Sequence, residues 1–299
     1  MPPDFPVRLA IWRPFSFFAR VHGQKGLPMY QDTLDQFADI AAKKVKALRA
    51  NPIGFFIACM MAGAYVGLGI VAIFSVGQVI DPSLRPLAMG LTFALALTLV
   101  IFAGAELFTG HTMMMTIGVL RGKVSLGGLA QSWGMTWAGN LVGAVILAAI
   151  FYLGGGGQIL KEGADLIFTT AAAKMSAAPM ALVAKGILCN WLVCLAIWMS
   201  ARTKSDAAKC ILIFWCLFAF IASGFEHSVA NMTLFAIALF AKHPDTVTVG
   251  GMFYNLLWVS IGNIISGVVF MGFAYWQANG RNAAAAPAPV ANPAAVPAE

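Results

Sequence analysis

The sequence predicts an all-α membrane protein with six transmembrane helices, of which the second and the fifth are broken. Two observations predict this class. The 299-residue chain is 60% hydrophobic and 10% charged, with a mean hydropathy of +0.81, whereas soluble domains carry about 25% charged residues. The few charges also divide the chain into long uncharged runs, and a helix needs about 20 apolar residues to cross the hydrocarbon core of a bilayer.

Three of the expected crossings are simple, uncharged helices, because a charge at the centre of a membrane helix costs roughly 2.5–3.5 kcal/mol on insertion scales. A fourth unbroken crossing, at about 178–201, contains Lys185, which we expect to point at Glu226 or at the extracellular vestibule. Pairing with Glu226 is favoured, since an unpaired ammonium at that depth tends to lose its proton. The other three crossings lie in the uncharged runs 50–80, 124–160 and 246–280.

Two further stretches are each interrupted by a single carboxylate. Residues 86–120 are interrupted only by Glu106, and residues 210–241 only by Glu226. Each stretch is too long for one ordinary span and too short for two. We therefore predict that each makes one crossing from two half-helices with a loop between them.

The basic residues predict how the chain is oriented. With six crossings, the two termini and two of the loops share one side of the membrane, and these segments together hold 14 Lys and Arg. The opposite loops hold four, and Lys185 lies inside a span. This asymmetry predicts that both termini are cytoplasmic. The net charge of +7 is thus a signal of topology, and we expect no nucleic-acid partner.

The two halves of the chain carry matching motifs in the same order. G-x-E occurs at 104–106 and 224–226, inside the two broken stretches, and GNLVG at 139–143 is matched by GNIISG at 262–267. Because three crossings reverse the direction of the chain, a three-plus-three repeat must be inverted. Channels and transporters with a site near the midplane have this architecture.

The two ends of the chain fall outside the bundle. Residues 34–49 place apolar side chains near one helical face with lysines opposite, so we expect a cytoplasmic amphipathic helix at 29–50. The channel domain then covers 51–280. Residues 281–299 are rich in Ala and Pro and are expected to form a disordered tail. Residues 1–28 are an N-terminal extension, either disordered or upstream of the true start.

Several polar residues at the breaks have structural interpretations. Glu106 and Glu226 are expected to stabilise the loops by accepting backbone N–H bonds that the breaks leave open. Asn140 and Asn263, in the two G-N motifs, could hydrogen-bond the same loops from neighbouring helices. His111 follows the first break, where capping a half-helix and lining a pore are equally good interpretations.

Two classes of function other than transport fit poorly. An intramembrane metalloenzyme would need to combine Glu106 and His111 with Glu226 and His227, but adjacent residues of a regular helix cannot both point at one centre. The sequence also has no H-E-x-x-H motif, and its five cysteines show no C-x-x-C spacing. We therefore expect no metal, cofactor or catalytic residue. A membrane anchor or scaffold does not explain two polar breaks at matching places.

Four long motifs can be compared with known families: AGAYVGLG (62–69), AELFTGHTM (105–113), CNWLVCLAIW (189–198) and GFEHSVANMT (224–233). They closely resemble the formate/nitrite transporter family, and more narrowly its bacterial nitrite channel branch. The resemblance covers roughly residues 29–278. It implies an aquaporin-like fold, a homopentamer in the bacterial inner membrane with one pore per protomer, and passage of small monovalent anions without enzyme activity or cofactor.

The resemblance also implies roles for individual residues. The functional threonine of the first loop is matched by Thr109, the histidine of the second loop by His227, and a lysine at the periplasmic mouth by Lys174. Formate channels carry an apolar residue where this chain has Lys185, which agrees with the nitrite branch. The pore asparagines are matched by Asn190 and Asn231, and the two constrictions by Phe93, Leu97, Leu107, Val193 and Phe220.

An anion cannot cross an apolar constriction cheaply, since desolvating a charge costs several kcal/mol. Half-helix N-termini, expected near Thr112 and Val229, would supply partial positive charge. Histidine gains or loses a proton near neutral pH. We therefore expect Lys174 to concentrate anions, His227 to stabilise or protonate them between two hydrophobic slits, and Thr109 to donate or relay a hydrogen bond opposite.

Within transport, two alternatives to a nitrite channel remain open. One is a proton-coupled transporter of formate or another small monocarboxylate, and the other is a neutral-solute channel of aquaporin type. Flux of nitrite, formate, lactate and water into proteoliposomes, measured against pH, separates these functions.

Overall fold

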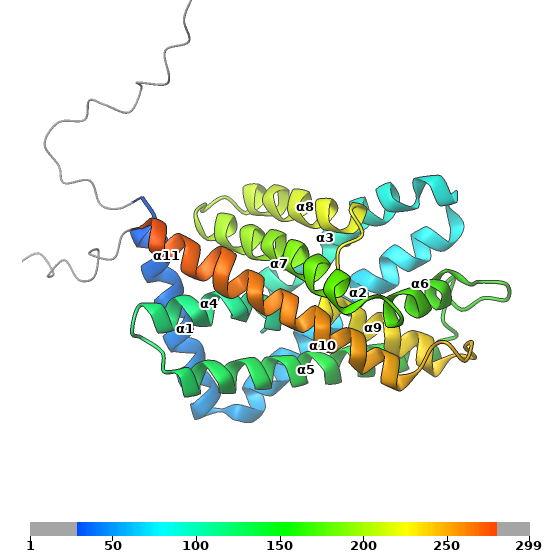
Figure 1. The fold of residues 1–299 in the computed structure, drawn as a ribbon, viewed down its shortest axis with the longest axis horizontal. Coiled ribbons are helices and arrows are strands. Elements are labelled where there is room, and N and C mark those ends of the chain that lie inside the picture. The colour runs from blue at the N-terminus through cyan, green and yellow to red at the C-terminus, as the bar shows by residue number, and fades with distance from the viewer. Residues whose placement is uncertain (1–28, 280–299) are drawn as a thin grey trace, which may run out of the picture.

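The computed structural model describes residues 29–279, which form a bundle of helices joined by short connections (Figure 1). These described residues contain no strand, so the predicted all-α class is confirmed. The predictions for residues 1–28 and for the tail fall outside the described range. The elements are α1 (Gln31–Ala50), α2 (Pro52–Val79), η1 (Pro82–Leu84), α3 (Arg85–Ala103), α4 (Phe108–Leu120), α5 (Leu126–Leu153), α6 (Leu166–Met175), α7 (Pro179–Ala201), α8 (Asp206–Ala222), α9 (Ser228–Phe240), α10 (Val249–Ile265), the π-helix η2 (Ser266–Phe273) and α11 (Ala274–Ala278).

Among residues 29–279, five helical segments are long and apolar enough to cross a membrane by length and composition. The shorter helices α4, α8 and α9 also lie in the predicted broken stretches and have 13, 17 and 13 residues. The five long segments are Pro52–Val79, Pro82–Ala103, Leu126–Leu153, Pro179–Ala201 and Val249–Ala278.

Local sequence signals fix where the long helices begin. The Asn51 side chain accepts a hydrogen bond from the Gly54 N–H at 2.9 Å, and Pro follows Asn51 at the first helical position of α2. The hydroxyl of Ser125 accepts from the Gly128 N–H at 3.1 Å and caps α5 in the same way. Side-chain caps satisfy backbone donors that have no partner within the helix, which stabilises the chosen start.

Glycines let pairs of long helices approach closely. A Cβ atom added at Gly143 of α5 would lie 1.8 Å from the Met60 carbonyl oxygen of α2. A Cβ atom added at Gly262 of α10 would lie 2.3 Å from the Val183 carbonyl oxygen of α7. Such contacts between backbones are available only to glycine, and small residues at helix interfaces are typical of membrane bundles. These close approaches bring the G-N motif of α5 against α2 and the G-N motif of α10 against α7.

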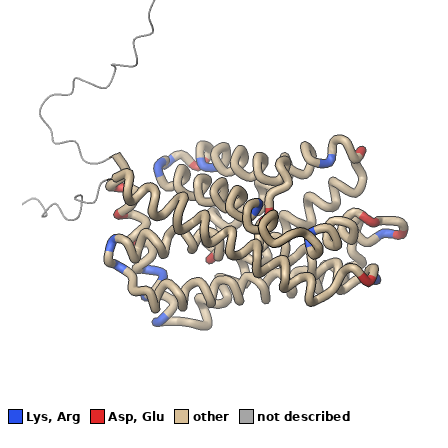
Figure 2. Tube along the Cα trace, viewed as in Figure 1, with Lys and Arg blue, Asp and Glu red and all other residues tan. Residues whose placement is uncertain are grey.

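Helix α1 packs across one end of the bundle (Figure 1). Its apolar face is buried against other helices, with the Phe37 ring stacked on Trp198 at 5.6 Å between centroids. Ion pairs from Asp35 to Arg121 and from Asp39 to Lys123 tie it to the turn that follows α4. Figure 2 shows several basic residues at this end. The apolar face of α1 thus contacts protein.

Candidate functional site

The first helix break lies between α3 and α4. Helix α3 ends at Ala103, and Gly104 follows with φ +78°, a left-handed conformation that glycine adopts without strain. Helix α4 begins at Phe108, four residues before the expected start near Thr112. That prediction was wrong because the Phe108 N–H already has an acceptor, the Asn140 side-chain oxygen at 2.9 Å. Thr109 therefore lies in the first turn of α4 and not in a loop.

The second break lies between α8 and α9 and has the same form. Helix α8 ends at Ala222, and Gly224 adopts φ +68°. Helix α9 begins at Ser228, one residue before the expected position. His227 is its N-cap, since ring atom Nδ1 accepts a hydrogen bond from the Ala230 N–H at 3.1 Å. The break thus fixes the orientation of this imidazole.

Asn140 and Asn263 make equivalent hydrogen bonds to the two breaks from α5 and α10. The Asn140 amide nitrogen donates to the Glu106 carbonyl at 2.9 Å, while its oxygen accepts from the start of α4. The Asn263 amide nitrogen donates to the Glu226 carbonyl at 3.2 Å, and its oxygen accepts from the Ser228 N–H at 3.1 Å. Each amide therefore satisfies a donor and an acceptor that the interrupted helix leaves open.

The two breaks meet through Thr109 and His227. The Thr109 hydroxyl oxygen lies 3.2 Å from Nε2 of His227, and both side chains are buried. Because Nδ1 accepts from a backbone N–H, the proton of the neutral ring lies on Nε2. The ring therefore donates to the Thr109 oxygen, and the threonine hydroxyl keeps its own proton for another acceptor.

The two carboxylates do not play the role that we expected. Their oxygens pair with side chains and not with backbone N–H groups. Glu226, which is 3% exposed, accepts from Lys174 at 2.8 Å and from the Asn231 amide at 2.7 Å. The expected pairing with Lys185 is wrong, since that side chain is exposed and only its backbone carbonyl accepts from the Glu226 N–H, at 3.3 Å. Lys174 reaches the carboxylate from α6.

Glu106 occupies the corresponding place at the first break. Its carboxylate pairs with Lys44 of α1 and lies 2.6 Å from Nε2 of His111. Nδ1 of His111 lies 2.8 Å from the Ser132 hydroxyl of α5. His111 is thus fully buried in a polar network with Glu106 and Ser132, beside the break.

Three residues of these networks were missed from the sequence: Lys44, Ser132 and Asn255. Asn255 accepts a hydrogen bond from the Asn231 amide at 2.9 Å. A signal for two of them exists, because Ser132 and Asn255 each precede the asparagine of a G-N motif by eight residues. That spacing is about two helical turns and places them on the same face. Lys44 is one of several lysines of α1, and nothing in the sequence distinguishes it.

Asn190 donates hydrogen bonds to backbone carbonyls where the two breaks meet. Its amide nitrogen lies 2.6 Å from the Asn263 carbonyl, 3.0 Å from the Thr112 hydroxyl and 3.3 Å from the Thr109 carbonyl. The Thr112 hydroxyl in turn donates to the Thr109 carbonyl at 2.6 Å. The side-chain oxygen of Asn190 is buried and has no hydrogen-bond partner within residues 29–279.

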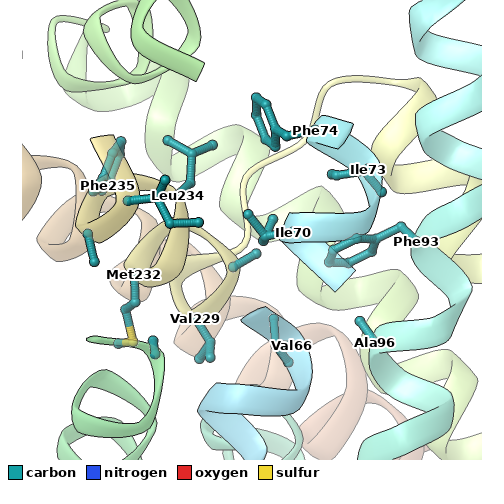
Figure 3. Close-up of a cluster of buried hydrophobic side chains, with 14 of the residues drawn as sticks. Val66, Ile70, Ile73, Phe74, Phe93, Ala96, Val229, Met232, Leu234 and Phe235 are labelled. Carbon is teal, nitrogen blue, oxygen red and sulfur yellow. The ribbon is translucent and has the colours of Figure 1, made fainter. Parts of the chain in front are cut away.

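Apolar side chains surround the meeting point. The Phe93 ring lies edge-on to Phe220 with 5.4 Å between centroids, and Phe220 lies nearly parallel to the His227 ring at 6.1 Å. Figure 3 shows Phe93 of α3 against Ile70 and Ile73 of α2. The remaining constriction residues, Leu97, Leu107 and Val193, are buried in the same cluster.

Two cavities approach this apolar region and together are lined by half of the predicted site residues. The Lys174 cavity, about 270 Å³, is lined by Lys174, Phe220, His227 and Asn231 among others. The Lys44 cavity, about 410 Å³, is lined by Lys44, Glu106, Leu97 and Leu107 among others. Each cavity has a lysine paired with a carboxylate near one break. Within residues 29–279, no group of three or more His, Cys, Asp or Glu side chains is placed to hold a metal ion.

Comparison with known proteins places this geometry among transport proteins. The sequence profile described as "Formate/nitrite transporter" matches residues 31–277. The chain is 52% identical to the nitrite transporter NirC of Salmonella typhimurium over 267 residues, which cover 89% of this chain and 98% of that protein. A solved FNT family ion channel superposes with a TM-score of 0.81 at 54% identity, covering 83% of this chain and 98% of that one. A pentameric formate channel with formate bound gives a TM-score of 0.66 at 29% identity, covering 77% and 98%.

Proposed function

Since this chain belongs to the formate/nitrite transporter family, we propose that it moves nitrite across the bacterial inner membrane through one pore in each protomer. It is a multi-pass membrane protein whose relatives are transporters and channels. The observation that carries the proposal is the contact between Thr109 and His227. It joins two helix breaks between two lysine-bearing cavities.

The architecture that we propose has six crossings. Four are long helices, and each of the other two combines a helix pair across a break, α3 with α4 and α8 with α9. Matching hydrogen bonds at the two breaks, from Asn140 and from Asn263, support an inverted repeat of two three-crossing halves. With the distribution of Lys and Arg, this arrangement puts both termini and α1 on the cytoplasmic side.

Entry of the anion depends on the two lysines. Lys174 in one cavity and Lys44 in the other are each held by a carboxylate, Glu226 and Glu106. The pairing fixes each ammonium at the wall of its cavity and makes the local net charge close to neutral. The ammonium can still donate hydrogen bonds to an entering anion. Because the carboxylate offsets its charge, the anion is not held so tightly that it stays, as conduction requires.

His227 stabilises the anion between the cavities as a neutral hydrogen-bond donor. The ring can direct Nε2–H at the anion, while Nδ1 stays bonded to the Ala230 N–H. The alternative route, in which the ring protonates the anion, requires Nδ1 to gain a proton first and so breaks that bond. The Thr109 hydroxyl supplies a second donor from the opposite break, and the N-termini of α4 and α9 add partial positive charge.

The protomer is expected to assemble as a homopentamer in the bilayer. A solved neighbour at 29% identity is described as a pentameric formate channel. Many large apolar side chains of this chain are exposed, Ile53 and Ile150 among them. Surfaces of this kind are covered by lipid or by neighbouring protomers.

A second candidate is a proton-coupled transporter of formate or another small monocarboxylate, because the solved formate channel shares the fold. The higher identity to nitrite transporters favours nitrite. The test is a flux series in proteoliposomes that contain the purified protein, with nitrite, formate and lactate measured against pH. We expect nitrite flux to exceed formate flux at equal driving force. Faster formate flux would contradict nitrite as the preferred substrate but would still be consistent with an anion pore in each protomer.

A further inference from the structure

A groove that the pore does not use lies between α1 and the turn that connects α4 to α5. Its volume is about 630 Å³, and it shares no lining residue with the Lys44 cavity or the Lys174 cavity. Its rim carries Lys46, Arg49 and Lys123, and its floor contains Val45 and Val124. The groove therefore combines positive charge with an apolar base.

Two of the three cations on the rim are free to bind a ligand. Lys123 pairs with Asp39. Lys46 and Arg49 are exposed, lie three residues apart on one face of α1, and form no ion pair with any residue in the described range 29–279. Two adjacent unpaired cations on a rigid helix favour a ligand that carries a phosphate group, since phosphate can accept from both at once.

The surroundings of the groove indicate that this ligand also has apolar chains. Val45 and Val124 belong to a buried cluster with Ala41 and Met115, so the floor is firm and apolar. Two lining residues of the groove, Ala50 and Ser125, stand just before α2 and α5. The first turns of these helices expose large apolar side chains: Ile53 is 74% exposed and Leu126 72% exposed.

A change from cations to apolar surface within one helical turn marks the level where membrane helices leave the headgroup region and enter the hydrocarbon. We propose that this groove binds the headgroup of an anionic phospholipid of the inner leaflet, with the phosphate between Lys46 and Arg49 and the acyl chains along the surface of Ile53 and Leu126. Inorganic phosphate would use the rim without the apolar surface. A second copy of the chain would have to bury two unpaired cations, which is costly.

The experiment measures binding of phosphatidylglycerol and phosphatidylcholine, with identical acyl chains, to the full-length detergent-purified protein by native mass spectrometry. We expect wild type to prefer phosphatidylglycerol by on the order of tenfold, and the double variant Lys46→Gln/Arg49→Gln to lose that preference. The matched control is Lys43→Gln/Lys204→Gln, which removes two exposed basic residues of the described chain that do not line the groove. This control should keep the preference.

Each other outcome overturns the proposal. Equal binding of phosphatidylglycerol by wild type and by Lys46→Gln/Arg49→Gln would exclude this groove as the site. Inorganic phosphate that binds as tightly as the lipid would show that the acyl chains contribute nothing. Protection of Lys46 from chemical labelling in delipidated pentamer, but not in monomer, would assign the groove to a neighbouring protomer. Nitrite flux through the double variant serves as the folding control and should equal that of wild type.

Discussion

The Thr109 hydroxyl oxygen lies 3.2 Å from Nε2 of His227, and this contact joins two helix breaks that are 118 residues apart in the sequence. Thr109→Val removes the hydroxyl at nearly constant volume, and with it the second hydrogen-bond donor to the anion, which is worth about 1.5–3 kcal/mol for a charged acceptor. We expect nitrite flux in proteoliposomes to fall by on the order of tenfold. Thr109→Ser keeps the hydroxyl and should stay close to wild type; equal loss in both variants would mean that packing, not the hydrogen bond, matters.

The Lys174–Glu226 pair should be coupled in transport. Lys174→Gln leaves a carboxylate that is 3% exposed without its counter-ion beside the anion path. The uncompensated negative charge repels nitrite, so we expect initial flux to fall by roughly tenfold or more. Lys174→Gln/Glu226→Gln should recover part of that loss. The control is Lys161→Gln, an exposed lysine in the connection before α6. Additive losses in the double variant would exclude coupling.

Asn140 and Asn263 should contribute to stability more than other amides do. Each satisfies backbone groups on both sides of a break, so truncation to Ala leaves buried donors and acceptors unpaired. We expect Asn140→Ala and Asn263→Ala each to lower stability by roughly 2–3 kcal/mol, measured by thermal unfolding in detergent. Gln78→Ala removes one hydrogen bond of 3.4 Å and should change little. Similar shifts for all three variants would argue against this role.

The close approach of α2 and α5 predicts opposite effects for two glycines of α5. A Cβ atom at Gly143 would lie 1.8 Å from a backbone oxygen of α2, which cannot move aside. We expect Gly143→Ala to destabilise the fold by roughly 1–3 kcal/mol or to prevent assembly. Gly134 has nothing within 4 Å of an added Cβ atom, so Gly134→Ala should be neutral or stabilising by about 0.5–1 kcal/mol. Thermal unfolding compares the two variants. Equal effects would show that α2 and α5 pack less closely at Gly143 than the structure indicates.

The sequence indicates where α3 and α8 end inside the two long apolar stretches, whereas the partners of the side chains at these ends could not be predicted. A carboxylate and a glycine within a long apolar run mark an interrupted helix, and G-N motifs at matching places indicate which helices would support the two loops. The start of α4 was misplaced because Asn140 supplies an acceptor for Phe108 from another helix. Such a contact is set by tertiary packing and has no local pattern.

The ion pairs could not be predicted from the sequence for the same reason. The sequence favours Lys185 as the partner of Glu226, because an unpaired ammonium inside a span tends to lose its proton. The structure brings Lys174 to the carboxylate because the short helix α6 packs against α9. Likewise, Lys44 reaches Glu106 only because the apolar face of α1 packs on the bundle. Charge partners depend on where short helices dock, and hydropathy does not encode that.

The central claim is that the imidazole of His227 is the donor that stabilises the anion between the two cavities. The most direct measurement is nitrite flux into proteoliposomes over a pH series for wild type, His227→Asn and the control His243→Asn, which changes an exposed histidine in the loop after α9. Asparagine can still cap α9, so the variant should fold. The account predicts flux lower by on the order of tenfold for His227→Asn and unchanged for His243→Asn. A His227→Asn channel with the rate and pH dependence of wild type would contradict it.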